Sequence, residues 1–123
     1  MRIAVAGGAG VVGRHVVSTL HDAGHDPVIL ARAAGVDLST GSGLEHALRG
    51  AAVVIDVSNI ATASPGSSRA FFERSTGHLL AAGARVGGAH HVALSIVGID
   101  QVPGGYYSGK LVQEGLVRDS TIP

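Results

Sequence analysis

The glycine-rich segment at residues 6–13 constrains the fold of this chain more than any other feature. Its glycines recur at every third position: Gly7, Gly10 and Gly13. A compact apolar run, residues 2–6, precedes the segment, and an amphipathic stretch, residues 11–23, follows it. A strand, a glycine turn and a helix in this order predict the first βα unit of a parallel sheet, with a phosphate-binding site at the turn.

Each glycine has a separate expected task in such a turn. Gly7 allows the tight turn, and Gly10 has no side chain to keep a pyrophosphate away from the backbone. Gly13 permits close packing between the helix and the strand. The helix begins with Val11 and Val12. Its N-terminus there offers free N–H groups and a partial positive charge to phosphates. The alternative is a glycine-rich turn that binds no ligand.

The rest of the chain alternates between short apolar runs and longer amphipathic stretches. The expected strands are residues 2–6, 27–31, 36–38, 51–57 and 91–96. The expected helices are residues 11–23, 44–48, 69–86 (entered at 65–68) and 106–119. This alternation predicts a three-layer, doubly wound α/β Rossmann fold with a parallel sheet, formed by one domain over residues 1–123. We expect that domain to be incomplete at its C-terminus, because no residues remain for a last strand or a substrate-binding region.

Composition excludes several other classes of protein. Apolar residues make up 46% of the 123 residues, which is enough for a buried core. Basic and acidic residues number 9 each, so there is no basic excess of the kind that binds nucleic acid. The chain has no cysteine, and its histidines show no metal-ligand spacing, so we expect neither a disulfide nor a metal site. No apolar run approaches the roughly 18 residues of a membrane span, and a cytoplasmic protein is expected.

The residues after the second expected strand favour one dinucleotide over another. An acidic residue at this point would bind the ribose 2′-hydroxyl of NAD, but the strand ends in Arg32 and the next acid is Asp37. A guanidinium at Arg32 suits the 2′-phosphate of NADP, so NADP is the expected cofactor and NAD the alternative. A solvated surface arginine is the other interpretation of Arg32. Asp37 and Leu38 are expected beside the adenine, although Asp37 also suits a loop turn.

Tyr106 and Lys110 are four residues apart in an expected helix and therefore share one face. An ammonium beside a phenol stabilises the phenolate and lowers the tyrosine pKa from about 10, which suits proton exchange with a carbonyl or an alcohol. Tyr107 is the second candidate. Ser95 ends the preceding strand, where its hydroxyl suits a substrate oxygen. A pair on a helix surface is the alternative, but the glycine turn and Ser95 favour a catalytic set.

These segments together resemble the short-chain dehydrogenase/reductase superfamily, and most closely its atypical, NmrA-like members with NAD(P)-binding Rossmann domains. The resemblance covers essentially the whole chain. It is carried by the glycine turn and by residues 75–82, 91–98 and 106–111. It implies Tyr106 as general acid/base, Lys110 as the modifier of the tyrosine pKa and the ribose anchor, and Ser95 as the substrate positioner. It also implies cofactor contacts from Ser58 and Asn59, although Asn59 equally suits a turn.

The resemblance implies an NAD(P)-dependent oxidoreductase that transfers hydride between NADP(H) and a small carbonyl, alcohol or quinone-like substrate. Two alternatives stay open: a non-catalytic, NAD(P)-sensing regulatory module, and an inactive truncated fragment. The missing last strand would leave an exposed sheet edge, so we expect marginal stability or a homo-oligomer. Phe71 and Phe72 are expected to be one core residue and one partly exposed residue, with an oligomer interface as a further role for them.

Overall fold

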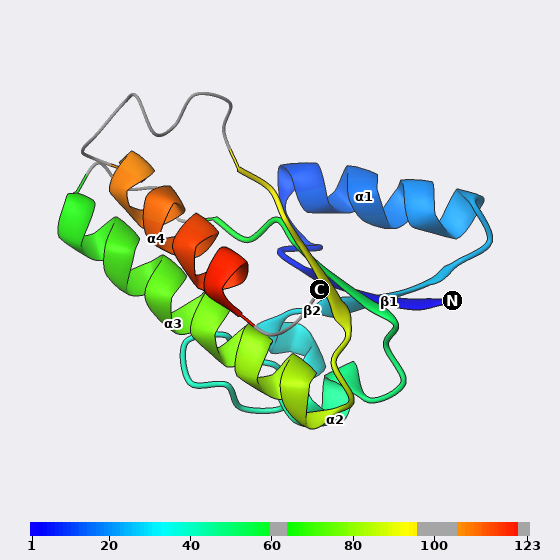
Figure 1. Ribbon diagram of the computed structural model, residues 1–123. Coiled ribbons are helices and arrows are strands. Elements are labelled where there is room, and N and C mark those ends of the chain that lie inside the picture. The colour runs from blue at the N-terminus through cyan, green and yellow to red at the C-terminus, as the bar shows by residue number, and fades with distance from the viewer. Residues whose placement is uncertain (60–63, 96–105, 121–123) are drawn as a thin grey trace.

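The computed structural model describes residues 1–59, 64–95 and 106–120. Four parallel strands form one sheet in the order β2-β1-β3-β4. The strands are β1 (Arg2–Ala6), β2 (Asp26–Leu30), β3 (Val53–Asp56) and β4 (His90–Ala93). The helix α1 (Val11–Asp22) lies on one face of the sheet, and α3 (Pro65–Arg85) and α4 (Tyr106–Asp119) lie on the other (Figure 1). This arrangement confirms the predicted doubly wound Rossmann-type α/β fold.

The strand β1 is central because its residues are almost entirely apolar. Ile3 to Ala6 are buried, and the strand pairs with β2 on one side and β3 on the other. At the end of this register Ala6 lies opposite Leu30 and Asp56. The carboxyl ends of the three strands are therefore level, and the segments that follow them emerge at one edge of the sheet.

The helices follow the predicted amphipathic stretches closely. The helix α4 has the predicted bounds, and α1 ends one residue before the prediction. The helix α3 is continuous from Pro65, and Ser64 caps it by accepting a hydrogen bond from the Ser67 N–H at 3.3 Å. Proline at the first position and serine at the cap are favoured helix starts, so the predicted entry at residues 65–68 is the first turn of the helix itself.

The predicted strand at residues 36–38 is wrong. A short 3₁₀ helix, η1 (Arg32–Ala34), follows β2, and residue 37 makes only an isolated antiparallel bridge with Ser42. The chain cannot extend here because Gly35 has a φ of +82° and because the Asp37 carboxylate accepts hydrogen bonds from both the N–H and the hydroxyl of Ser39. Val36 is nevertheless buried, so its apolar character reflects the core and not a strand.

The two faces of the sheet are covered unequally. The main core lies between the sheet and the layer of α2 (Leu44–Leu48) and α3, where Leu44, Leu48 and Leu79 are fully buried. On the α1 side, Val92 and Leu94 remain 43% and 47% exposed. No helix in the described part of the chain is long and apolar enough to cross a membrane.

Candidate functional site

Three adjoining cavities form a groove along the carboxyl edge of the sheet; we call it the carboxyl-edge groove. The first, of about 270 Å³, has Arg32, Asp37 and Leu38 in its wall. The second, of about 400 Å³, is formed by the glycine turn. The third, of about 140 Å³, is formed by Ser58, Asn59, Ser95, Lys110 and three apolar neighbours. Gly7 belongs to the first two cavities, and Val12, Val57 and Asn59 to the last two.

The groove brings together the predicted site residues whose side chains or backbone the structure describes. These are Gly7, Gly10, Val11, Val12, Gly13, Arg32, Asp37, Leu38, Ser58, Asn59, Ser95 and Lys110. Tyr106 is the first residue of α4, but its side chain, like that of Tyr107, lies outside the described part of the chain. The edge of a parallel sheet beyond its carboxyl ends is where such folds bind ligands.

The glycine turn has the geometry that its spacing predicts. Gly7 has a φ of +81°, which other residues rarely adopt, and its N-terminal neighbour ends β1. A Cβ at Gly13 would overlap the carbonyl oxygen of Gly7, so α1 packs against the turn at a distance that only glycine permits. At Gly10 a Cβ would stand only 3.3 Å from the same oxygen. The turn is therefore a tight backbone cradle.

The start of α1 is open to an anion. Its N-cap residue, Gly10, has no side chain to satisfy the first N–H groups, and the first turn contains no acidic residue. Val11 and Val12 are exposed there, although they are apolar. Unsatisfied N–H groups and the helix dipole favour a negatively charged group at this position. The cradle thus fits the pyrophosphate that the sequence predicts.

Arg32 and Asp37 differ in how firmly they are held. The Arg32 side chain is exposed, and no hydrogen bond or ion pair with a described residue fixes its guanidinium. Asp37 is held by Ser39, whose hydroxyl and N–H both donate to its carboxylate at 2.7 and 2.9 Å. The Ser39 hydroxyl, more than any other group, lowers the pKa of Asp37. Asp37 therefore has the turn role that the sequence left open, while it also lines the groove.

Lys110 lies at the opposite end of the groove and is almost completely buried. Its Nζ donates to the Leu94 carbonyl oxygen at 2.7 Å and to Oε1 of Gln113 at 2.9 Å. The same ammonium lies 4.6 Å from the centre of the Phe72 ring, within the range of a cation–π interaction. Burial lowers the pKa of Lys110, while the nearby Asp56 and Glu114 carboxylates act to raise it.

Ser95 reaches the same cavity from the end of β4. Its hydroxyl donates to Oε2 of Glu114 on α4 at 3.1 Å. A carboxylate beside the hydroxyl orients its oxygen as a hydrogen-bond acceptor for another donor. Ser95 and Lys110, which are fifteen residues apart, thus line one small cavity together with the cofactor candidates Ser58 and Asn59.

Sequence reasoning missed the two side chains that hold this end of the groove in place. Asp56, at the end of β3, accepts hydrogen bonds from the N–H and the hydroxyl of Ser58. It also accepts one from Nε2 of Gln113 on α4 at 3.0 Å. A carboxylate inside the most apolar expected strand was the available signal, because aspartate is almost never fully buried without partners.

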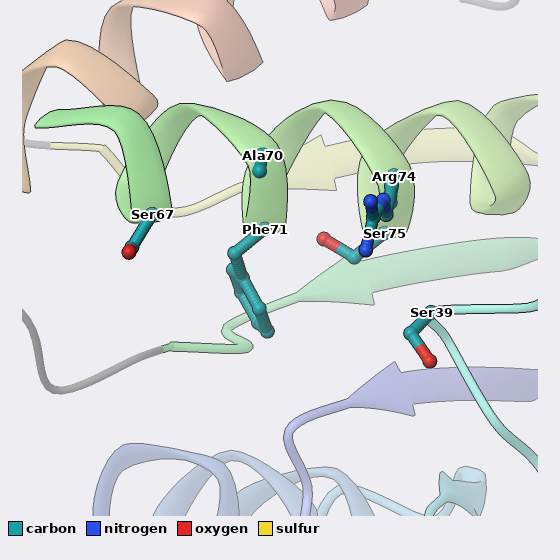
Figure 2. A pocket seen from close by; sticks show the side chains of 6 residues that line it. All are labelled: Ser39, Ser67, Ala70, Phe71, Arg74 and Ser75. Carbon is teal, nitrogen blue, oxygen red and sulfur yellow. The ribbon is translucent and has the colours of Figure 1, made fainter.

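A further cavity adjoins the Arg32 end of the groove. It measures about 280 Å³ and lies between the loop at Ser39 and the first half of α3 (Figure 2). In Figure 2 the Phe71 ring points from α3 toward the ends of the strands, and both Ser39 and Phe71 also line the groove.

Ser75, also on α3, is 1% exposed and its hydroxyl has no hydrogen-bond partner among the described residues. Phe72 is fully buried, whereas Phe71 is only partly buried. This confirms the prediction of one core and one partly exposed phenylalanine.

Comparison with known proteins rests on structure. No protein-family model matches the chain, and no curated protein matches its sequence. Triphenylmethane reductase from Citrobacter sp., solved with NADP(H), is similar with a TM-score of 0.79 at 18% identity, over 100% of this chain and 47% of that one. UDP-N-acetylglucosamine 4-epimerase from Bacillus cereus has a TM-score of 0.78 at 23% identity, over 96% of this chain and 50% of the epimerase.

A short-chain dehydrogenase/reductase superfamily protein from Agrobacterium tumefaciens, solved with bound NAD, is similar over 99% of this chain and 47% of that protein. Its TM-score is 0.73 and its identity 24%. The chain therefore spans about half the length of these solved structures. At such identities the similarity establishes the fold: this chain has the Rossmann-type α/β fold of these reductases and epimerases.

Proposed function

We propose that the chain binds NADP(H) in the carboxyl-edge groove and belongs to an NAD(P)-dependent oxidoreductase of the short-chain dehydrogenase/reductase type. The observation that carries this proposal is the continuity of the groove. It runs from an exposed guanidinium, past an open helix end, to a buried lysine beside a serine hydroxyl. The order of these groups matches the order of the 2′-phosphate, the pyrophosphate and the nicotinamide ribose along the cofactor.

The chain's own residues divide the work of binding. Arg32 would pair with the 2′-phosphate, and the N–H groups at Val11 and Val12 would bind the pyrophosphate. Leu38 and Phe71 offer apolar walls to the adenine. Among the similar structures, triphenylmethane reductase was solved with NADP(H) and the Agrobacterium tumefaciens protein with NAD, which supports a nicotinamide dinucleotide here.

The chemistry at the Lys110 end follows from three groups. When bound, the nicotinamide supplies or accepts the hydride. Tyr106, one helical turn before Lys110, would give a proton to the carbonyl oxygen of the substrate or take one from an alcohol. The Lys110 ammonium would stabilise the phenolate of Tyr106 and donate to the ribose. The Ser95 hydroxyl would hold the substrate oxygen: it would accept from an alcohol while it donates to Glu114, and would turn its proton from Glu114 to a carbonyl. The substrate class is a small carbonyl, alcohol or quinone-like compound.

A non-catalytic dinucleotide-sensing module is the second candidate, and one observation favours it. Within the described residues the Lys110 ammonium already has two hydrogen-bond acceptors and an aromatic ring around it. A lysine held in this way suits a structural role as well as a catalytic one. This chain spans about half the length of the similar proteins. The same site could therefore be active in a longer protein and inactive in this chain alone.

Replacement of Tyr106 by Phe separates the two candidates. In an oxidoreductase, Tyr106→Phe should reduce turnover of NADPH at least about 100-fold, since general acid/base catalysis contributes 100-fold or more. The Kd for NADPH, measured by calorimetry, should stay within about twofold, because the hydroxyl is not a phosphate-binding group. Equal turnover in the wild-type chain and the variant, with carbonyl and quinone substrates, would contradict the catalytic proposal and leave the sensing module.

A further inference from the structure

Four polar side chains form a buried, connected network between the sheet and α4. Asp56 and Gln113 are 0% exposed, Lys110 is 4% exposed and Ser58 is 6% exposed. They come from the end of β3, from the segment that follows it, and from two positions three residues apart on α4. Polar groups at this depth are costly unless each has a partner. The network is therefore a specific arrangement and not a set of surface contacts.

The Gln113 amide joins a negative and a positive group through its two ends. Its Nε2 donates to Oδ2 of Asp56 at 3.0 Å, and its Oε1 accepts from Nζ of Lys110 at 2.9 Å. The opposite amide orientation would place an NH₂ group against the ammonium and an oxygen against the carboxylate. Only the observed orientation satisfies both contacts. The Asp56 carboxylate thus fixes the direction in which the amide oxygen faces Lys110.

The same carboxylate also ties down the wall of the groove. Its Oδ1 accepts from the N–H and the hydroxyl of Ser58, and Ser58 lines the cavity that holds Lys110 and Ser95. One buried carboxylate therefore positions both the segment after β3 and the ammonium on α4. The sequence separation of 57 residues between Asp56 and Gln113 shows that this link is a tertiary one.

The charged surroundings of Lys110 come from few groups in the described part of the chain. Asp56 on β3 and Glu114 on α4 face it, and Glu114 also accepts from Ser95. The Asp56 carboxylate also acts on His91 of β4, where it opposes the lowering of the histidine pKa by burial. From α3 the contact is the neutral Phe72 ring. Burial disfavours the ammonium, and Asp56 is the fully buried carboxylate that opposes this effect.

We propose that Asp56 is a positioning residue that acts through Gln113 to keep the Lys110 ammonium charged and directed into the Ser95 end of the groove. What Lys110 does there rests on the proposed function, but the position and charge of the ammonium do not. A carboxylate that only docked α4 onto the sheet would leave the titration of Lys110 unchanged when it is neutralised, and one that acted by its charge alone would leave it unchanged when the Gln113 amide is removed. The difference is measurable without any cofactor.

The experiment exploits the fact that Lys110 is the only lysine of the chain. With lysine labelled at Cε and Nζ, NMR reports a single side chain across a pH series of the dinucleotide-free chain. Asp56→Asn keeps the shape and one of the two acceptor oxygens, replaces the other oxygen by a donor NH₂ group, and removes the charge. We expect this variant to lower the pKa of Lys110, because the carboxylate that opposes the effect of burial is lost. Asp22→Asn, an exposed carboxylate on α1, is the matched control and should change nothing.

Two further measurements keep the proposal open to contradiction if Asp56→Asn does not fold. Gln113→Met keeps the volume and removes the amide link, and it should also lower the pKa of Lys110. In the wild-type chain, the Nζ protons should exchange with water at least about 10-fold more slowly than those of an exposed lysine, because two acceptors hold them. An unchanged Lys110 titration in a folded variant, or exchange as fast as in free lysine, would overturn the proposal.

The outcomes are separable from those of the proposed function. A shifted Lys110 titration with no dinucleotide binding would support the positioning role and contradict the oxidoreductase. Dinucleotide binding with an unshifted titration would contradict the positioning role and support the proposed cofactor site, whether the chain is catalytic or a sensing module. Where turnover is measurable, Asp56→Asn should move the pH dependence of kcat in the same direction as the lysine pKa.

Discussion

The two ends of the carboxyl-edge groove are built in different ways. The glycine-turn end is formed by backbone that is local in sequence, from β1 through Gly7 and Gly13 into α1. The Lys110 end is formed by side chains from β3, β4 and α4, joined by hydrogen bonds across 57 and 16 residues. The first end therefore depends on which positions lack a side chain, and the second on which polar groups find partners in the interior.

This difference predicts how each end responds to substitution. At the glycine turn an added side chain should abolish dinucleotide binding, because it would overlap neighbouring backbone atoms that have no room to move. At the Lys110 end an isosteric change should alter charge and proton transfer and leave the backbone in place. Between the two, Arg32 is exposed and makes no hydrogen bond or ion pair with a described residue, although its charge helps to lower the pKa of Asp37. Its removal should therefore chiefly affect a ligand.

The largest effect is expected for Gly13→Val. The added Cβ would overlap the Gly7 carbonyl oxygen, so α1 and the turn must move apart, at a cost of about 3 kcal/mol in the free energy of unfolding. NADPH binding should be lost with the turn. Gly77→Ala on α3 is the matched control, since its Cβ would meet nothing within 4 Å. We expect this control to stabilise the chain by about 0.5–1 kcal/mol.

Chemical denaturation of both glycine variants would measure this contrast. A Gly13→Val variant as stable as Gly77→Ala, or one with unchanged affinity for NADPH, would contradict the close approach of α1 to the turn.

The next largest effect is expected for Arg32→Ala. Loss of the charge-assisted hydrogen bonds to the 2′-phosphate should weaken NADPH binding about 10- to 100-fold, at about 1.4 kcal/mol for each factor of ten. The Kd for NADH should stay within about twofold. Arg118→Ala, an exposed arginine near the end of α4, should change neither affinity. If calorimetry found both dinucleotides weakened equally by Arg32→Ala, the guanidinium would not be the 2′-phosphate group.

A smaller and non-selective effect is expected for Phe71→Ala. The ring lines both the Arg32 cavity and the adjoining cavity on α3, so its removal takes away an apolar wall for the adenine. We expect the affinities for NADPH and NADH to fall together, each about fivefold, as the loss of about 1 kcal/mol implies. Glu73→Gln, at an exposed position of the same helix outside both cavities, is the control. Unchanged affinities in Phe71→Ala would place the adenine elsewhere.

The smallest effect is expected for the pH dependence of stability near His91. Burial lowers the pKa of His91 below its ordinary value of about 6.5, so the unfolded chain binds more protons between the two values. The contribution of His91 to stability should therefore rise with pH through this window and be lost again on acidification. His91→Gln should flatten the change in Tm between pH 5 and about pH 7. A profile identical to that of the wild-type chain would contradict the shift.

The same contrast explains what sequence reasoning could and could not predict. The bounds of β1 and α4, and the start of α1, follow from apolar runs, periodicity and glycine spacing, which are local properties. Val36 misled the prediction of a third strand because a buried apolar residue was read as part of an extended run, whereas Gly35 and the Asp37 turn decide the backbone there.

Only some of the residues at the Lys110 end could be predicted, because sequence patterns report local properties and this end depends on tertiary contacts. Spacing and position along the chain pointed to Ser95 and Lys110, but no local pattern pairs Asp56 with Gln113. Their partnership depends on how α4 rotates against the sheet, which is a property of tertiary packing. The one local hint was the carboxylate in an otherwise apolar strand.

The measurement that tests the central claim most directly is a calorimetric titration of the 123-residue chain with NADPH and with NADH at one fixed salt concentration. We predict that NADPH binds at least about 10-fold more tightly than NADH, and that Arg32→Ala removes the difference. Absence of binding by both dinucleotides, with the chain shown to be folded, would contradict the assignment of the carboxyl-edge groove as a cofactor site. Equal affinities would contradict the role of Arg32 in selecting NADP(H).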